Sequence, residues 1–596
     1  MIKVVTNIQN FINNYRSLTS LIIVSLFIIL TDSLFNIYYT EITKFIYDVF
    51  NISPEYHNGL DLSFAPEIWG GVLATVLGTL IIVIAIAAES TPKLMDLFVK
   101  DWISLTFIWF LVFCSVHAIF VMQYFQPLGR PSSVIINSYI YLPISTILSL
   151  PYIFYILLYS KTDNVIKKLY SLNVQNIERL KKSSLHLSME DSKIVEQYQY
   201  SLMSTIDQFD DLLEYISFKE AQTDIIRRVG DTVRTYIKAK SDISHNFFLT
   251  TPTIRYNPTF RTYVENQYKE LAERKTFYEV KSFRMLGNAY IRKMDNGEYE
   301  LASLIVSEVV DVGLLAIEYQ ENNLITDINI RFNTFMRFAI KHAVKNNEPR
   351  NLYNLAFHYA QLLQGYVRED EIDLLKQGYF YFKFYGNEIY KHAATNPSLY
   401  FIVDTLTSEL KKISILISEK NWDMEVQEHL LNLILQLDNP PDYPKDDLDQ
   451  NVNNGVRVLQ IGLGLHYIKI KNKKFAKKII SDVLDDLSFF DTKVYLSLMD
   501  GLYNRIRFSP ATFWEDTDRG NTNIYYSPDS DYIDDFKKVL SDEMRKRLDK
   551  LDRDVQFLKL ELDKLKIKDK TSSLSEKEKI RISEIESKIR TRRKLS

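Results

Sequence analysis

Cysteine is almost absent from this chain, because Cys114 is the single cysteine among 596 residues. One cysteine excludes an intrachain disulfide framework and a zinc cluster built on cysteine ligands. Glycine and proline are also scarce, at 17 and 16 residues. This scarcity favours long helices over a loop-rich or β-rich fold, so we expect an all-α protein.

An excess of charge of one sign is missing too, because 72 lysine and arginine residues balance 75 aspartate and glutamate residues. A general nucleic-acid-binding protein needs a basic face, so no nucleic-acid partner is expected. The common phosphate-loop, zinc-protease and serine-hydrolase motifs are absent, and Gly462-Leu463-Gly464 lacks a third glycine. We expect no cofactor and no metal. The motifs favour a non-enzymatic protein and leave an enzyme open, because residues brought together only in space could still form a triad.

What the chain does have is long apolar runs in its first quarter. Four of them cover residues 18–38, 70–88, 103–124 and 134–159. The second, Gly70 to Ala88, carries no charge, and as a helix it would rise about 28 Å, close to the ~30 Å hydrocarbon core of a bilayer. Residues 18–160 are therefore predicted to form a four-helix transmembrane domain in contact with the lipid bilayer.

A short amphipathic segment precedes the first span. Apolar side chains in residues 1–17 fall on one face at helical spacing, flanked by Lys3 and Arg16. This pattern is typical of a helix lying on the membrane surface, and the alternative is a plain extension of the first span.

Basic residues indicate the orientation of the spans. They precede the first span, lie between the second and third, and follow the fourth: Lys3, Arg16, Lys93, Lys100, Lys161, Lys167 and Lys168. The other two loops hold only Lys44 and Arg130. The positive-inside rule then places both termini in the cytoplasm. Since the composition is typical of an AT-rich bacterial genome, we expect a multi-pass protein of the inner (plasma) membrane.

The chain after residue 160 is mostly helical by its 3.6-residue periodicity. Helices are expected near 162–184, 189–216, 219–241, 260–294, 297–319, 326–345, 349–366, 370–394, 398–419, 424–437, 453–471, 474–488 and 492–506. Short turns join them, which suggests stacked antiparallel pairs, although no clean fixed period is visible. Residues 161–530 are predicted to form a large cytoplasmic domain that is an α-solenoid or an irregular bundle.

Residues 531–596 carry a heptad pattern. Apolar residues alternate spacings of four and three from Met544 to Leu565. After a polar turn, Ile582, Ile585 and Ile589 keep the same seam. We expect an antiparallel C-terminal coiled-coil hairpin, and an intermolecular coiled coil is the alternative.

One stripe of the second span consists of small residues and ends in an acidic one. It contains Gly71, Ala74, Thr75, Gly78, Ala85 and Glu89. Small residues let helices approach closely in lipid, so the stripe favours packing against a neighbouring span. The alternative is a face that lines the central axis or pore of a homo-oligomer, where a ring of Glu89 side chains would favour cations.

Asp32 and His117 are ionisable residues inside the first and third spans. Each lies fourteen residues from the cytoplasmic start of its span, hence about 21 Å deep. Ionisable groups in a membrane are costly and usually find a partner or a watery cavity. A facing pair could relay protons or bind a cation. The alternatives are a structural hydrogen bond and an Asp32 side chain that snorkels outward.

A polar loop near residue 515 combines an aromatic residue, carboxylates and an arginine. Its candidate site residues are Trp514, Glu515, Asp516, Asp518 and Arg519. A divalent cation would need these oxygens to converge, but their spacing is not that of an EF-hand. An ion pair between Arg519 and a nearby carboxylate, with Trp514 fixing the loop to the helices, is the simpler interpretation.

The run from Gly71 to Phe113 resembles an uncharacterised family of predicted bacterial four-span membrane proteins. In that family a span of small residues ends in a Ser-Pro-Arg-like polar cluster, and a second span follows closely. The corresponding residues here are Ala87-Ala88-Glu89-Ser90-Thr91-Pro92-Lys93. The resemblance covers the membrane domain, and it implies an architecture but no activity.

The sequence thus predicts a membrane-anchored sensor or assembly module. Its helical cytoplasmic domain would bind an unidentified protein partner, because Tyr- and Phe-rich helices supply the aromatic anchors that interfaces use. The chain is also expected to form a homo-oligomer. The alternative function is an oligomeric cation channel gated by the cytoplasmic domain. A membrane-bound enzyme is the third hypothesis.

Overall fold

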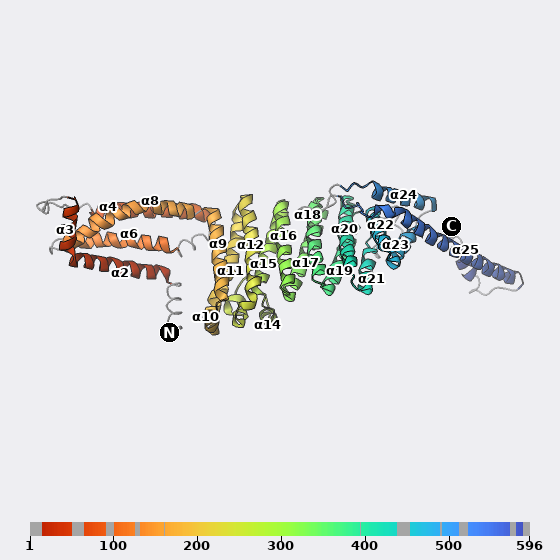
Figure 1. The fold of residues 1–596 in the computed structure, drawn as a ribbon, viewed down its shortest axis with the longest axis horizontal. Coiled ribbons are helices and arrows are strands. Elements are labelled where there is room, and N and C mark those ends of the chain that lie inside the picture. The colour runs from red at the N-terminus through yellow and green to blue at the C-terminus, as the bar shows by residue number, and fades with distance from the viewer. Residues whose placement is uncertain are drawn as a thin grey trace. The chain divides into compact units, whose positions relative to one another are not determined.

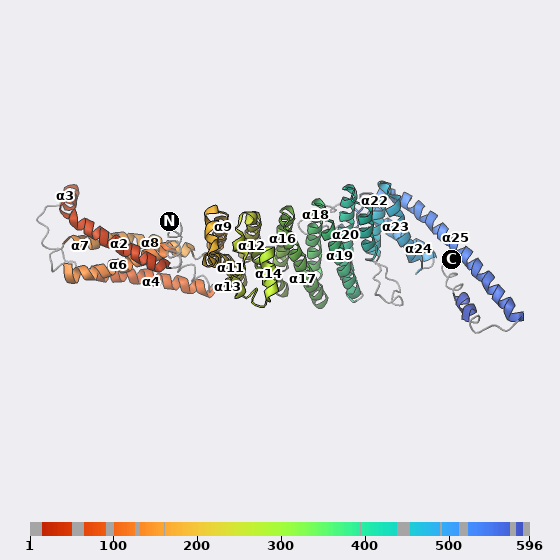
Figure 2. The same ribbon diagram turned by 90° about the horizontal axis from the view of Figure 1, so that it is seen from below.

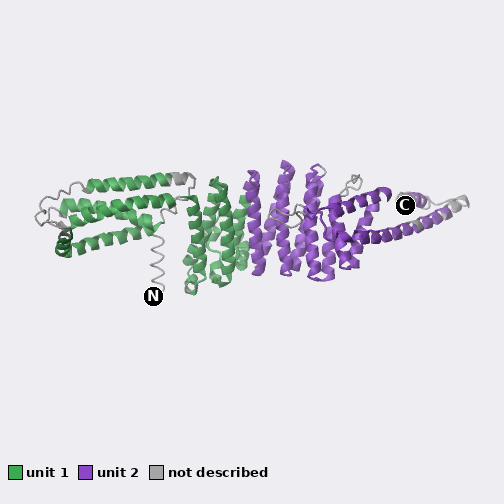
Figure 3. Cartoon of the chain, turned by 45° about the horizontal axis from the view of Figure 1, so that its top comes forward, with its two compact units in different colours: residues 1–289 green, residues 290–596 purple. Residues whose placement is uncertain are grey.

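The computed structural model describes the chain apart from residues 1–14, 51–64, 91–100, 126–130, 160, 394, 438–452, 489–491, 512–522, 572–579 and 588–596. Every regular element in the described part is a helix, so the predicted all-α class is confirmed (Figure 1). The chain divides into two compact units, residues 1–289 and residues 290–596 (Figure 3). The domain boundaries expected at residues 160 and 530 stay predictions.

Unit 1 begins with four helical runs that are long and apolar enough to cross a membrane. They contain α2 (Arg16–Ile37), α4 (Ala65–Ser90), α6 (Trp102–Phe120) and α8 (Leu142–Tyr159), and a further helix, α3 (Tyr39–Phe50), follows α2. Helix α6 packs against α2 and α4, and α4 packs against α8. We call residues 15–159 the apolar bundle. The predicted helix over residues 1–17 lies almost wholly outside the described residues.

Two π-helical turns lie in the helical runs of the apolar bundle. They are η2 (Val121–Phe125), which follows α6, and η3 (Ile136–Tyr141), which joins α7 (Pro131–Ile135) to α8. A π-turn inserts an extra residue into a helix and re-aims its side chains, and such turns recur at functional sites. In η3 the buried side chains include Asn137 and Tyr141.

The rest of unit 1 is a set of amphipathic helices. They are α9 (Thr162–Leu180), α10 (Ser183–His186), η4 (Leu187–Glu190), α11 (Ser192–Tyr215), α12 (Lys219–Ala239), η5 (Lys240–Asp242), η6 (His245–Phe248), α13 (Pro252–Arg255), α14 (Glu265–Arg274) and α15 (Phe277–Asp295), which crosses the unit boundary. The single helix predicted over residues 260–294 is wrong. Lys275 adopts a left-handed conformation with φ of 57° and ends α14 there. The sequence gives no sign of this break, because glycine usually takes that position.

Unit 2 begins with helix pairs. Its elements are α16 (Tyr299–Glu318), α17 (Asn322–Asn346), α18 (Arg350–Arg368), α19 (Ile372–Ala393), α20 (Ser398–Glu419), α21 (Met424–Ile434), α22 (Asn454–Lys469), α23 (Lys473–Asp485), η7 (Asp486–Ser488), α24 (Thr492–Phe508), η8 (Ser530–Tyr532) and α25 (Ile533–Thr571). The first helices of successive pairs, α16, α18, α20 and α22, pack against one another in order. We call α16 to α23 the helical array.

The turn inside each pair of the array is built in the same way. Gln320, Asp370, Asn421 and Lys471 each adopt a left-handed conformation, at spacings of 50, 51 and 50 residues. After each of them the next backbone N–H bonds to a carbonyl five residues back, as Glu321 does to Ala316. This is the Schellman pattern that closes a helix end. The array is therefore a helical repeat whose period is carried by turn geometry.

The C-terminal helix α25 is followed by a short helix that folds back on it (Figure 2). Val555 and Ile585 form a small core, and the Arg581 guanidinium lies 3.2 Å from the Glu561 carboxylate. Because the earlier residue of α25 meets the later residue of the second helix, the two run antiparallel. The contact lies within one chain, as a hairpin requires, and a coiled coil stays a prediction.

Candidate functional sites

The structure brings Asp32 of α2 and His117 of α6 together inside the apolar bundle. Oδ1 of Asp32 lies 3.8 Å from Nε2 of His117, and both side chains are largely buried. The pair meets because α2 and α6 pack along each other and bring the two residues to the same level of the apolar bundle. Its role, whether proton relay, cation site or structural contact, stays a hypothesis.

Asn137 of η3 connects this pair to α4. Its Oδ1 accepts a hydrogen bond from Nε1 of Trp69 in α4 at 2.9 Å, and its Nδ2 donates to the Cys114 carbonyl at 3.1 Å. Nδ2 also lies 2.9 Å from Nδ1 of His117. Since an indole N–H only donates and a carbonyl only accepts, the Asn137 amide has one orientation. Nδ1 of neutral His117 then accepts, and its ring proton sits on Nε2, toward Asp32.

The small-residue stripe of α4 faces away from the rest of the apolar bundle. A Cβ added to Gly71 or Gly78 would meet no heavy atom within 4 Å in the part of the chain that the structure describes. Ala74, Thr75 and Ala85 are exposed, whereas Trp69, Val76, Leu80 and Val83 on the other face are buried. No described span of the same chain packs on this stripe. Glu89 lies in α4, and its side chain is outside the described residues.

The predicted polar loop site, Trp514, Glu515, Asp516, Asp518 and Arg519, lies outside the described residues. Among the residues that are described, no group of three or more His, Cys, Asp or Glu side chains is arranged to hold a metal ion.

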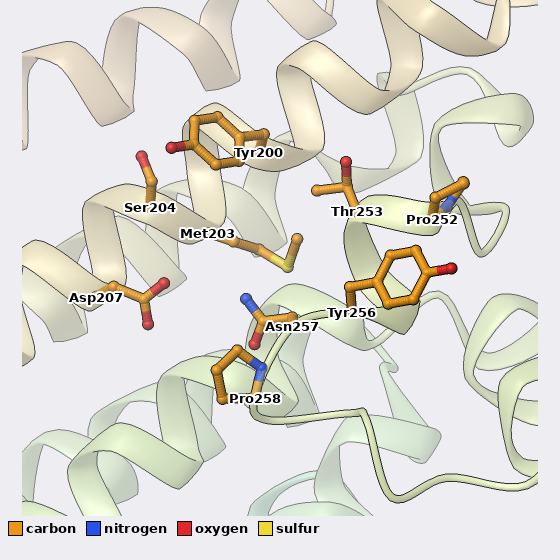
Figure 4. Close-up of a pocket in the computed structure, with 9 residues that line it drawn as sticks. All are labelled: Tyr200, Met203, Ser204, Asp207, Pro252, Thr253, Tyr256, Asn257 and Pro258. Atoms are coloured by element: carbon orange, nitrogen blue, oxygen red, sulfur yellow. The ribbon is translucent and has the colours of Figure 1, made fainter.

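Unit 1 has a surface pocket of about 420 Å³ between α11 and the segment that contains α13 (Figure 4). It is lined by Tyr200, Met203, Ser204, Asp207, Pro252, Thr253, Tyr256, Asn257 and Pro258. The buried Lys281 ammonium donates to Asp207 at 2.6 Å and to Asn257 at 3.2 Å, so it offsets the charge of Asp207. The pocket has the size of a small-molecule site.

The segment Asn523–Tyr532, which we call the strap, contacts buried polar groups of the helical array. The Tyr525 hydroxyl donates to Asp404 of α20 at 2.5 Å, and the Lys411 ammonium donates to the Tyr526 carbonyl at 3.4 Å. Asp529 lies 3.3 Å from Nδ1 of His466 and 2.7 Å from the Lys469 ammonium. Burial raises the pKa of Asp404 to about 6 and lowers the pKa of Lys411 to about 8. Burial also lowers the pKa of His466.

Glycines of α22 make room for these side chains. A Cβ on Gly455 would lie 1.9 Å from Oδ2 of Asp404, and one on Gly462 would lie 3.0 Å from the Lys411 ammonium. A Cβ on Gly464 would lie 2.7 Å from the Phe536 ring of α25. The three glycines therefore permit close approach at the site. Their presence in one helix was the sequence signal that reasoning from motifs missed.

The buried Lys411 predicts a specific pH dependence. The folded lysine loses its proton near pH 8, whereas the unfolded lysine does so near pH 10.5. Between these values the unfolded state binds more protons, so the free energy of unfolding should rise with pH. From pH 8 to about 9.5 the rise is about 2 kcal/mol. Urea unfolding read by hydrogen exchange of α20 measures it.

The matched variants decide whether Lys411 causes this rise. Lys411→Met should abolish it, and Lys345→Met, at an exposed position of α17, should leave it unchanged. An equal rise in the Lys411→Met protein would contradict the assignment.

Comparisons with known proteins add little to this geometry. No protein-family model and no curated protein sequence matches the chain. Among solved structures, the chain is similar to a "circular tandem repeat protein with novel repeat topology and enhanced subunit contact surfaces". The two are 11% identical, the match covers 81% of this chain and 99% of that chain, and the TM-score is 0.35. A TM-score of this size does not establish a common fold. The resemblance of Gly71 to Phe113 to a bacterial membrane-protein family stays a prediction.

Proposed function

We propose that the chain is a membrane-anchored assembly module, in which the apolar bundle lies in a bilayer and the helical repeat binds a cytoplasmic protein. The observation that carries the first half is the outward surface of the bundle. Its exposed large apolar residues include Ile23, Leu26, Phe27, Ile29, Leu30, Ile81, Ile82, Ile147, Leu150 and Phe154. Soluble proteins rarely expose so large an apolar surface, whereas lipid solvates it.

Aromatic residues on the helical array support the second half of the proposal. Phe380 and Phe384 lie one turn apart on α19 and are exposed, and Ile330 is exposed on α17, which packs against α19. We call Phe380 and Phe384 the aromatic patch, and Ile330 adds an exposed apolar side chain on the neighbouring helix. Repeat arrays present extended surfaces to their partners, and exposed aromatic residues are typical anchors of such interfaces.

Photo-crosslinking in cells tests this proposal. A photoreactive amino acid at position 384 should give one discrete protein adduct, and Phe380→Glu should remove the adduct because it puts a charge into an apolar contact. Gln377→Glu, an exposed position on the same helix, is the matched control and should keep it. If position 384 gives no adduct, the surface around Phe380 and Phe384 does not bind the partner.

A cation channel is the second candidate, and the open small-residue stripe of α4 is the observation that favours it. Small residues on an unoccupied face suit self-association in lipid, as a homo-oligomer requires. Gly78→Leu should then weaken self-association in membranes about tenfold, a change of about 1.4 kcal/mol. Chemical crosslinking of the protein in vesicles, with a reagent that forms no disulfide, measures the strength of self-association. Ile147→Leu on α8 is the control.

Conductance separates the two candidates. If a purified oligomer in planar bilayers passes cations and Gly78→Leu abolishes the current, the channel is favoured. An oligomer that stays silent at every voltage supports the module and removes the channel.

A further inference from the structure

The strap covers three ionisable side chains of the helical array that are almost fully buried. Asp404 and Lys411 on α20 and His466 on α22 are only 4%, 5% and 6% exposed, and strap residues contact all three. Burying charged groups is costly unless hydrogen bonds compensate them. If the strap only had to cover a core, apolar residues at these positions would serve at lower cost. The surface therefore has the character of a polar recognition site.

Two side chains of the strap, Tyr525 and Asp529, make specific polar contacts with the helices beneath it. The Arg505 guanidinium of α24 lies over the Tyr525 ring, 3.8 Å from the ring centroid. The Tyr525 hydroxyl donates a hydrogen bond to Asp404. Four residues later, the Asp529 carboxylate lies between His466 and Lys469 of α22. These contacts select a phenol at one end and a carboxylate at the other. The Lys411 ammonium binds a main-chain carbonyl between them, which any sequence supplies.

The strap also sits against helix backbone in the way that a bound peptide does. A Cβ on Gly462 of α22 would lie 3.6 Å from the Ser527 hydroxyl oxygen, an ordinary van der Waals distance, so Ser527 packs close to the backbone of α22. Ile524 and Ser527 are buried, and Pro528 is exposed. The strap leads directly into α25 through η8, so its attachment fixes where that helix begins.

We propose that α20, α22 and α24 form a peptide-binding groove, which the strap occupies in the resting chain. The external ligand of this groove is a protein segment that carries a tyrosine four residues before an aspartate. The inference rests on the proposed function, because it names the class of partner that the array takes. A tethered segment acts at a high effective concentration, so the strap inhibits the groove until it is displaced.

The test uses the full-length protein in detergent and a fluorescein-labelled synthetic peptide with the sequence of residues 523–532. The intact chain should bind the peptide weakly. A chain with Tyr525→Ala and Asp529→Ala in its own strap should bind it at least about tenfold more tightly, because the competing segment is weakened. A peptide carrying the same two substitutions should not bind. Adding Asp404→Ala and Lys469→Ala to the weakened chain should abolish binding.

The chain with Tyr525→Ala and Asp529→Ala could fail to fold, which loss of its helical circular dichroism signal would show. In that case a more conservative variant is used for the same binding measurement. Tyr525→Phe with Asp529→Asn removes the hydroxyl and the charge while keeping the shape of the strap. Fluorescence anisotropy that shows no binding to either weakened chain overturns the groove. If a crosslink at position 384 persists in that case, the assembly module stands and only the groove is wrong. Peptide binding without any such crosslink supports the groove and contradicts the aromatic patch as the partner surface.

Discussion

Replacing Arg457 by methionine is expected to lower the free energy of unfolding of unit 2 by about 3–5 kcal/mol. The guanidinium is 1% exposed and lies 2.7 Å from Asp486, which is also 1% exposed. It also lies 2.5 Å from Asp482 and donates to Gln460 at 2.8 Å. The substitution removes the Arg457 charge from the buried Asp486 carboxylate, and this lost attraction is the main cause of the loss.

Urea unfolding of the purified protein, localised by hydrogen exchange in α22 and α23, measures this loss. The control is Arg507→Met, because Arg507 and its partner Asp534 are 49% and 82% exposed. An exposed ion pair is worth less than about 1 kcal/mol, so this variant should unfold nearly as the original protein does. Equal small effects in both variants would contradict the claim that Arg457 holds α22 to α23.

Lys240→Met should produce a loss of similar size in unit 1. The Lys240 ammonium of η5 lies 2.8 Å from Glu279 of α15, and the two side chains are 4% and 0% exposed. Removing the lysine leaves the Glu279 carboxylate in an apolar interior without this cation, at a cost of about 3–5 kcal/mol.

The double variant Lys240→Met with Glu279→Met distinguishes a charge effect from lost packing. Two apolar side chains of similar volume remove the buried charge together with its partner, so the protein should return to within about 1 kcal/mol of its original stability. Hydrogen exchange in α12 and α15 reports both variants. A double variant that is less stable than Lys240→Met would show that packing at this site, rather than the unpaired charge, sets the cost.

Much of the fold was predictable because helical periodicity is a local property. The expected helices at 219–241 and 398–419 agree closely with α12 and α20. The repeat could not be read from the sequence, because Gln320, Asp370, Asn421 and Lys471 share a backbone conformation but no residue type. The break at Lys275 could not be predicted for the same reason, because a lysine does not indicate a left-handed conformation.

The candidate sites divide in a similar way. The proximity of Asp32 and His117 was predictable because both residues lie fourteen residues into predicted parallel helices, and residue counting supplies that distance. Asn137 could not be assigned a role, because its partners Trp69 and His117 lie 68 and 20 residues away along the chain. The contacts of the strap could not be predicted from the sequence either. Asp404 and Tyr525 are 121 residues apart, and the residues around each of them do not indicate that the two meet.

The orientation of the spans is the most direct test of the proposed membrane anchor. In a Cys114→Ala background, Asn58→Cys reports the loop between the first two spans, and Lys345→Cys reports the helical array. A membrane-impermeant maleimide added to intact cells should label the first protein, and should label the second only after the membrane is opened. Labelling of Lys345→Cys in intact cells, or release of the protein from membranes without detergent, would contradict a bilayer-anchored module that faces the cytoplasm.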